Sequence, residues 1–245
     1  MMTKKTVNYY CILLGPKMSF YEVIEIHEGY SNTSDKGMVA ICTCTLIKGK
    51  YNCIVNTMIP SNGELILKVL KDHQLKPEDI HYVICTNGDS GLIGNNHLFL
   101  ESTHIIGHTI SMKDIYHSNS LIYDRPYELD GKRLQLLPTP GLTLVDITVL
   151  VKTSRNTVVA ITGGLFEKKE DLTNNYIWLF SRPECPSLQR YYRNYIMNTA
   201  NRIIPGHGAG FEVDDDVKAS FDNHNSTHEN EKLLSLRDLY RLGLS

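Results

Sequence analysis

The segment at residues 82–95 constrains the fold more than any other part of the chain. An apolar, β-branched run, Tyr-Val-Ile-Cys at residues 82–85, leads directly into Thr-Asn-Gly-Asp-Ser-Gly-Leu-Ile-Gly-Asn at residues 86–95. An apolar run of this length bounded by Gly and Asn predicts a buried strand that ends in a loop. Loops at strand ends carry binding and catalytic residues in α/β proteins. We therefore expect an α/β fold whose functional site lies at this loop.

Length and composition favour one large domain followed by a polar tail. With 245 residues, of which 42% are hydrophobic, the chain can bury a sizeable core. The sequence predicts a single α/β domain over residues 1–212, followed over residues 213–245 by a polar linker and a short amphipathic segment. The linker is expected because apolar residues become sparse after Asp214-Asp215-Asp216, and residues 222–232 cannot bury enough surface to order themselves.

Charge and targeting signals exclude several classes of protein. The formal net charge is −2, which gives no overall attraction to nucleic acid or to a membrane surface. The first residues lack the apolar core of a signal peptide, and no run approaches the ~20 apolar residues of a membrane span. The six cysteines contain no Cys-x-x-Cys pair and fit buried, reduced thiols. We expect a soluble, intracellular protein in the cytoplasm, with the nucleus as a second location and no membrane partner.

Hydrophobic patterns and turn signals predict the order of the secondary structure. Apolar or alternating runs predict the following strands: 9–14, 21–26, 38–47, 51–57, 82–85, 127–129, 134–137, 146–151 and 158–162. Helical spacing predicts helices over 64–73 and 187–198, and a further helix beginning within 95–100. Asp130-Gly131 is a strong hairpin signal between two of the strands.

Five short motifs occur in a fixed order along residues 40–211. They are Val-Asn-Thr at 55–57, the loop at 86–95, Thr-Pro-Gly-Leu-Thr at 139–143, Thr-Gly-Gly-Leu-Phe-Glu at 162–167 and Pro-Gly-His-Gly at 205–208. Each motif is weak alone, but the ordered set is specific. Together they resemble the metallo-β-lactamase family.

That resemblance implies both a fold and a chemistry. The implied fold is an αββα sandwich of two mixed β-sheets flanked by helices. The implied chemistry is zinc-dependent hydrolysis, in which two ions polarise the substrate and generate hydroxide. The resemblance is strongest to a compact animal member of the family, an endoribonuclease that acts on histone pre-mRNA 3′ ends.

The seven metal-ligand positions of the family are mostly occupied by other residues in this chain. In the family order His, His, Asp, His, His, Asp and His, the corresponding residues here are Asn87, Asp89, Gly91, Leu92, Leu142, Gly164 and His207. Only Asp89 and His207 carry side chains that we expect to be able to donate to a metal. No residue is assigned as catalytic from the sequence.

A count of donors argues against a working zinc centre. A catalytic zinc ion takes three protein ligands from His, Asp, Glu or Cys and keeps a water. By the family pattern one site would hold a single carboxylate and a weak amide oxygen, and the other a single imidazole. We therefore expect no cofactor and a pseudoenzyme, a non-catalytic scaffold or binding protein for an unidentified protein or small-molecule ligand. Zinc is the expected cofactor only if the family chemistry persists.

Two other functions compete with this prediction. The first is an active metal-dependent hydrolase or endoribonuclease with an atypical site around Asp89 and His207. The second is an RNA-binding module that does not cleave. For that module, the contacts would come from four residues of the expected helix 187–198, which could stack on and neutralise a single strand: Arg190, Tyr191, Arg193 and Tyr195. A stripe of this kind is more often a row of core tyrosines with solvated arginines.

Ordinary structural roles are expected for both surviving polar residues. Asp89 should accept backbone N–H bonds at a turn or helix start. His207 should be a core histidine that holds its own loop.

The end of the chain carries an apolar stripe. It consists of Leu233, Leu236, Leu239 and Tyr240. A lone helix of this length is marginal in water, so it should dock on its own domain, on a second copy in a homodimer, or on a partner.

Overall fold

Residues 20–35 and 37–226 are described by the computed structural model of the chain. Within them, strands form two large mixed sheets and a separate hairpin. The first sheet contains, in spatial order, β1 (Glu22–His27), β4 (Cys44–Lys48), β5 (Cys53–Val55), β6 (Tyr82–Cys85), β7 (Thr103–Ile106), β8 (Thr109–Met112) and β9 (Ile115–His117). The second contains β10 (Tyr127–Glu128), β11 (Leu134–Pro138), β12 (Ile147–Lys152), β13 (Val158–Gly163), β14 (Arg202–Pro205) and β15 (Phe211–Glu212).

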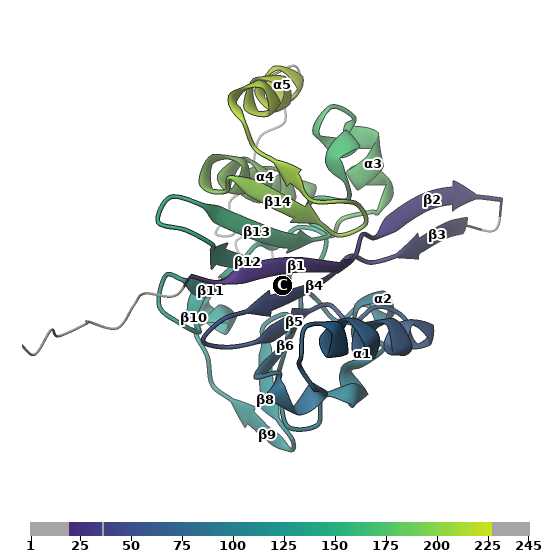
Figure 1. Ribbon diagram of the computed structural model, residues 1–245. Helices are drawn as coiled ribbons and strands as arrows, with labels where there is room; N and C mark the ends of the chain where they lie inside the picture. The colour runs from purple at the N-terminus through teal and green to yellow at the C-terminus, as the bar shows by residue number, and fades with distance from the viewer. Residues whose placement is uncertain (1–19, 36, 227–245) are drawn as a thin grey trace, which may run out of the picture.

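The described residues also contain a hairpin, five α-helices and short 3₁₀ helices. The hairpin pairs β2 (Tyr30–Ser34) with β3 (Gly37–Ile41). The helices are α1 (Gly63–Asp72), α2 (Ser90–Ile93), α3 (Asn175–Phe180), α4 (Pro186–Thr199) and α5 (Asp215–Ser226). The two sheets lie face to face, with α1 and α2 outside the first and α3, α4 and α5 outside the second (Figure 1). The expected αββα sandwich is confirmed.

Three apolar clusters correspond to the three interfaces between these layers. One joins the inner faces of the two sheets and includes Ile84, Val149 and Ile204. The second joins the first sheet to α1, and the third joins the second sheet to the helices above it. Strand β12 is buried at Ile147–Val151 because it is covered on both faces, as the apolar run in its sequence predicted.

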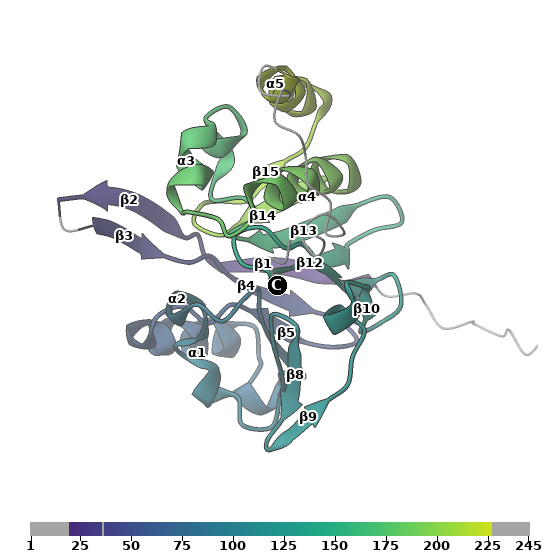
Figure 2. The same cartoon turned by 180° about the vertical axis from the view of Figure 1, so that it is seen from behind.

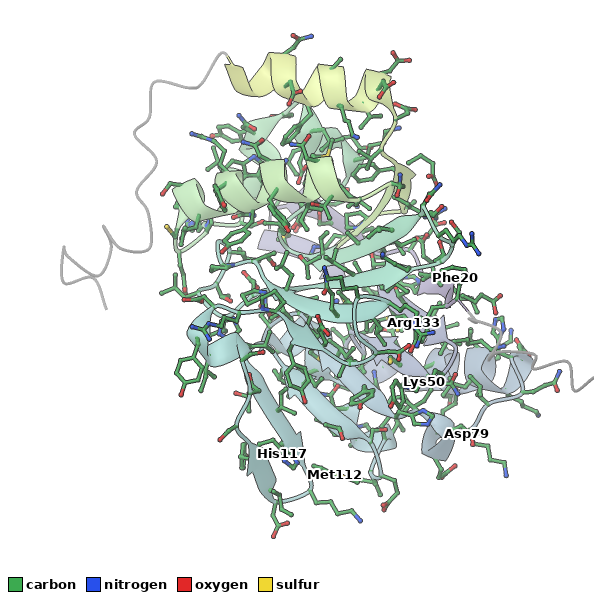
Figure 3. All side chains as sticks on the ribbon, turned by 90° about the vertical axis from the view of Figure 1, so that its left-hand side faces the viewer. Phe20, Lys50, Asp79, Met112, His117 and Arg133 are labelled. Atoms are coloured by element: carbon green, nitrogen blue, oxygen red, sulfur yellow. The ribbon has the colours of Figure 1, made fainter. Side chains whose placement is uncertain are left out.

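Most of the predicted elements are confirmed. The Asp130-Gly131 hairpin forms between β10 and β11, and β12 and β13 pair antiparallel as expected. Helix 64–73 corresponds to α1, and helix 187–198 corresponds to α4. At the end of the sandwich near that hairpin, Lys50 Nζ and Arg133 Nη2 both reach Oδ1 of the buried Asp130, at 3.0 and 2.9 Å, and the two basic residues lie next to each other in Figure 3.

Two predicted elements are wrong. The single strand expected over residues 38–47 is broken at Cys42 and Thr43, because the Thr43 N–H donates to the Gly206 carbonyl at 2.7 Å instead of to a neighbouring strand. No α-helix begins within 95–100, where the structure has only a 3₁₀ turn at Asn96–Leu98. The short helix α2 precedes this turn, and the side-chain amide of Asn95 between them donates to the carbonyls of Thr57 and Ile59.

The chain past residue 212 begins as a packed helix and not as the expected polar linker. The Val217 N–H donates to Oδ1 of Asp214 at 2.8 Å, which starts α5. Phe221 is 2% exposed, and its ring centre lies 6.4 Å from that of Phe166. Phe221 and, less deeply, Val217 thus dock α5 on the cluster above the second sheet. The strand expected at 9–14 and the stripe from Leu233 to Tyr240 lie outside the described residues.

The β2–β3 hairpin extends away from the sandwich on the side where α3 lies, as the front and back views agree (Figures 1 and 2). None of the helices in the described part of the chain is long and apolar enough to cross a membrane.

Candidate functional site

The loop after β6 connects the two sheets. The Thr86 carbonyl accepts the Ile147 N–H of β12 at 2.9 Å, and the Thr86 N–H donates to the side chain of Asn56 at 3.0 Å. These bonds place residues 87–92 at one end of the sandwich, where β12 begins. The position predicted for the functional loop is therefore at the junction of the two sheets.

Asn87, at the first ligand position, is bonded within the protein on both sides of its amide. Its Nδ2 donates to Oδ1 of Asp146 at 2.7 Å, and its Oδ1 accepts the Asp89 N–H at 2.9 Å. The Asn87 and Asp146 side chains are both buried. The amide therefore satisfies a buried carboxylate and starts a turn, and its oxygen is already committed to a backbone donor.

Asp89 caps helix α2. Its Oδ1 accepts the Gly91 N–H at 2.8 Å while its own backbone is extended, which is the arrangement of an N-cap residue. The structural role predicted for Asp89 is confirmed. The next two ligand positions supply no donor, because Gly91 has no side chain and the buried Leu92 belongs to the cluster between the first sheet and α1.

Leu142 and Gly164 come together where the family has His and Asp. A Cβ atom at Gly164 would overlap Cδ2 of Leu142, so the leucine side chain lies directly over the glycine. An aspartate at position 164 would need that leucine to move. Hydrocarbon therefore occupies the space between two of the family's ligand positions.

His207 lies against Glu167. Nδ1 of His207 is 3.0 Å from Oε1 of Glu167, although the atoms are not aligned as a hydrogen bond. The His207 N–H donates to the Glu167 carbonyl at 2.8 Å, which joins the two loops. Burial raises the pKa of the Glu167 carboxyl, but contacts with His207, Ser31 and Lys168 outweigh it and hold that pKa below its usual value. The backbone of His207 thus joins the loops, whereas its side chain is 18% exposed and has no aligned hydrogen bond at Nδ1, so the expected core histidine is not found.

The Glu167 loop is supported from behind by a buried ion pair. The Glu167 N–H donates to Oδ2 of Asp171 at 2.7 Å, and both oxygens of that carboxylate accept from the Arg193 guanidinium, at 2.8 and 3.0 Å. Arg193 is 2% exposed and Asp171 is 0% exposed. Arg193 therefore cannot contact RNA in this structure, and its predicted place in an RNA-binding stripe is wrong.

The arrangement on α4 is the reverse of the one expected. Tyr191 and Tyr195 are exposed, whereas Arg193 lies in the core. Arg190 is partly exposed. Arg193 lies in the core because the buried Asp171 carboxylate forms an ion pair with it there.

A cavity of about 550 Å³ opens beside these residues. Its wall contains the seven family ligand positions, together with Met38, Cys42, Ser90, Glu167, Arg182 and Glu184. We call it the ligand-position cavity. The structure therefore brings all seven predicted site positions to one hollow, although few of them carry a donor.

Cys42 is the cavity residue that most resembles a nucleophile. Burial raises the pKa of its thiol to about 12, although backbone N–H groups lower it slightly. The reactive form of cysteine is the thiolate. At neutral pH the thiol is therefore protonated and inert.

The side chains at these positions do not fit a zinc centre. Among the described residues, no group of three or more His, Cys, Asp or Glu side chains converges as a metal site would require. Asp89 caps a helix, Asn87 is bonded on both sides, and Leu142 covers Gly164. A bound metal would need all three to rearrange.

Sequence reasoning missed three functional-site residues: Asp146, Glu167 and Arg182. Glu167 ends the Thr-Gly-Gly-Leu-Phe-Glu motif, and Asp146 follows the Thr-Pro-Gly-Leu-Thr motif by three residues. Their motif positions were the available signal. Arg182 lies between motifs, and no pattern in the sequence marks it.

Asp146 gives the site a measurable dependence on pH. Burial raises the pKa of its carboxyl to about 6, although bonds from Thr143 and Asn87 lower it. The folded state therefore favours the protonated acid, so stability is lost as the pH rises from about 4 to about 6, by roughly 3 kcal/mol. Asp146→Asn should remove this loss. Urea unfolding across that pH range measures the difference.

An exposed carboxylate provides the control for this experiment. Asp72→Asn, at the end of α1, should leave the pH dependence of the wild type unchanged. If Asp146→Asn and the wild type lose stability in parallel between pH 4 and 6, Asp146 does not titrate as described.

Comparison with known proteins agrees with this fold. No family model matches the chain. Metallo-beta-lactamase domain-containing protein 1 of Xenopus laevis is 32% identical over 188 residues, which cover 76% of this chain and 79% of that protein. The mouse protein of the same name is 32% identical over 172 residues, covering 69% of this chain and 64% of that protein.

Solved structures share the fold at low identity. A Thermotoga maritima protein assigned to the metallo-beta-lactamases superimposes with a TM-score of 0.59 at 15% identity, covering 79% of this chain and 99% of its own. The dizinc quorum-quenching lactonase AidC superimposes with a TM-score of 0.55 at 14% identity. The match covers 76% of this chain and 86% of the AidC chain. The sequence relatives and the shared fold lead to one conclusion: this chain belongs to the metallo-β-lactamase family.

Proposed function

We propose that this chain is a ligand-binding member of its hydrolase family that uses no metal ion and does not cleave its ligand. The observation that carries the proposal is the packing of Leu142 on Gly164. Leu142 stands where the family has a histidine ligand. Its side chain also fills the space that an aspartate ligand at position 164 would need. A cavity of about 550 Å³ remains beside it, a volume within the usual range of small-molecule sites.

The state of the polar groups supports binding over catalysis. Asn87 and Asp89 use their oxygens to hold the loop, and the Cys42 thiol stays protonated. Hydrolysis needs an activated water or a nucleophile within reach of a base. His207 supplies an imidazole to the cavity, and its Nδ1 faces Glu167; within residues 20–35 and 37–226 no further His, Cys, Asp or Glu joins them to form a metal site.

The rival function is a metal-dependent hydrolase, such as the endoribonuclease of histone pre-mRNA 3′ ends that the resemblance suggests. It would require Asp89 to leave the α2 N-terminus and share an ion with His207 alone. Incubating the purified protein with a histone pre-mRNA 3′ fragment, with and without added zinc, tests it. Zinc-dependent cleavage would support the rival and overturn our proposal.

Metal content gives the direct test of our proposal. Protein purified without chelator, loaded with excess zinc and then desalted should carry well under one zinc, iron or manganese ion per chain. A chelator should shift the melting temperature by less than about 1 °C, because a ligand that binds only the folded state would stabilise it measurably. Elemental analysis and thermal unfolding measure the two quantities. Stoichiometric zinc, or a fall in melting temperature that zinc reverses, contradicts the proposal.

A further inference from the structure

Large apolar side chains gather along one side of helix α4. Tyr191 and Tyr195 lie four residues apart on one face of this helix, and both are exposed. Four more exposed apolar side chains come from the 3₁₀ helix η4 (Leu121–Tyr123) and from the loop before β12: Ile122, Tyr123, Leu144 and Val145. We call these six residues the α4 patch. Single exposed apolar residues are ordinary, whereas a group of this size marks a contact surface.

Contacts with α4 bring the other two segments of the patch beside it. The Tyr191 ring centre lies 5.1 Å from that of Tyr192. Burial and then the negative charge of Asp124, the residue after η4, raise the pKa of the Tyr192 phenol to about 12, which places that carboxylate near the phenol. The Leu144 N–H donates at 2.8 Å to Oε2 of Glu184, which lies just before α4 begins. Both η4 and the loop before β12 are therefore neighbours of α4.

A second set of contacts joins the loop to η4 through the turn between β7 and β8. A Cβ atom at Gly107 would lie 3.2 Å from Cγ2 of Val145, so the valine lies against this turn. Asn119 Nδ2 donates at 3.1 Å to the His108 carbonyl in the same turn, and Asn119 Oδ1 accepts the Leu121 N–H that begins η4. The α4 patch is therefore continuous. None of its six residues lines the ligand-position cavity.

Helix α5 ends on the same side of the molecule. The Val213 N–H donates to the Asn201 carbonyl at 2.8 Å, so α5 begins beside the C-terminal end of α4. Further along α5, the Phe221 ring centre lies 5.8 Å from the guanidinium centre of Arg193, in the middle of α4. The two helices lie one above the other in Figure 3. Helix α5 therefore runs back along α4 and ends toward its N-terminal half, which the loop of the α4 patch adjoins.

The chain that follows α5 is long enough to reach the patch. It continues for 19 residues past Ser226, and seven residues lead from Ser226 to Leu233, the first residue of the apolar stripe. Fully extended, seven residues span about 23 Å. A helix with its side chains is about 10–12 Å across, and the two patch tyrosines lie about 200° around α4 from Arg193. The connection can therefore pass around α4 from α5 to the tyrosines.

We propose that residues 233–242 of the same chain cover the α4 patch, with their apolar stripe against Tyr191 and Tyr195. The patch supplies an exposed apolar surface, and α5 delivers the segment to it. A short flexible connection also gives the segment an effective concentration in the millimolar range, which a second copy or a separate partner would have to exceed. The inference does not depend on the metal-free function proposed above.

Amide hydrogen exchange of the full chain tests the docking directly. Amides within residues 234–242 should exchange at least about tenfold more slowly than those of an unstructured chain, because docking orders them. Replacing both patch tyrosines, Tyr191→Ser with Tyr195→Ser, should remove most of this protection. The matched control replaces two exposed tyrosines on β9 and α3, Tyr116→Ser with Tyr176→Ser, and should leave it unchanged. Unprotected amides in the wild type, or protection that survives loss of the patch tyrosines, overturns the inference.

A pair of leucine variants tests which face of the segment makes the contact. Leu236→Ser removes a stripe residue, so it should raise exchange across residues 234–242 several-fold and lower the melting temperature by roughly 2–4 °C. Leu234→Ser removes a leucine that falls outside the stripe and should change neither quantity. Equal effects of the two substitutions overturn the stripe as the docking face. Amides of the buried strands β12 and β13 should stay protected in every variant, which verifies that the domain is folded.

Protein concentration separates docking within one chain from docking between two copies. Docking within the chain should give the same exchange rates over a roughly hundredfold range of protein concentration, because no second molecule takes part. Protection that increases with concentration would show that a second copy supplies the segment. That result overturns the proposed occupant of the α4 patch.

Discussion

Replacing Arg193 with alanine is expected to lower the free energy of unfolding by about 3–5 kcal/mol, the usual loss when one partner of a buried ion pair is removed. The guanidinium donates two bonds to the Asp171 carboxylate, one of 3.1 Å to the Asp171 carbonyl and one of 3.0 Å to the Leu165 carbonyl. Its centre also lies 4.3 Å from the ring centre of Phe166. Alanine would leave the Asp171 carboxylate charged, buried and unpaired.

The effect should be large in thermal unfolding because this one side chain connects several elements. Arg193 lies on α4, its carboxylate partner lies in the turn before α3, and the rings of Trp178 and Phe221 lie 5.2 and 5.8 Å away. We expect the melting temperature to fall by roughly 6–20 °C. Arg193→Lys should lose less, since an ammonium keeps the charge but not the two-pronged geometry.

An exposed arginine separates this effect from the loss of any arginine. Arg155 lies in the turn between β12 and β13 and is exposed. Arg155→Ala should change the free energy of unfolding by less than about 0.5 kcal/mol. A loss below about 1 kcal/mol for Arg193→Ala would mean that the buried pair contributes little to stability.

Restoring the family's ligands should give a variant that binds about two zinc ions per chain, more than the unmodified protein holds. The variant carries Asn87→His, Asp89→His, Gly91→Asp, Leu92→His, Leu142→His and Gly164→Asp, and keeps His207. Each change supplies a donor where the family places one. A histidine at position 87 retains a second ring N–H, which can keep the contact with Asp146 and orient the ring.

Two of these changes should depend on each other. Gly164→Asp alone places its Cβ against Cδ2 of Leu142, the end of a flexible and partly exposed side chain, so it should destabilise the protein by no more than about 1 kcal/mol. Adding Leu142→His removes the obstructing methyl group, and the double variant should recover part of that loss. Urea unfolding of the two single variants and the double variant measures the coupling.

Elemental analysis after desalting reads out the zinc content of the full variant. The same variant with His207→Ala should hold fewer ions, because His207 is the ligand that the chain retained. If the six changes produce a folded protein that binds no more zinc than the wild type, these positions do not form the family's metal centre here. Activity is a separate question from zinc content.

Most of the fold could be predicted because it is determined by local patterns. Period-two and apolar runs located β6, β12 and β13, and Asp130-Gly131 located the β10–β11 hairpin. These signals depend on a few consecutive residues, so they can be read without knowing which segments pack against them in the fold. The order of the five motifs then indicated the αββα sandwich, and the residue types at the seven ligand positions showed which donors were missing.

The tertiary structure decided which polar groups are free and which are committed. Only packing shows that Leu142 covers Gly164, that Glu167 faces His207, and that α5 docks through Phe221. The same holds for Arg193. The sequence pattern of α4 predicted that it faces solvent, but Asp171, 22 residues earlier, holds it in the core. Contacts of this kind join segments far apart in the sequence, so their energies appear only once the fold has brought the partners together.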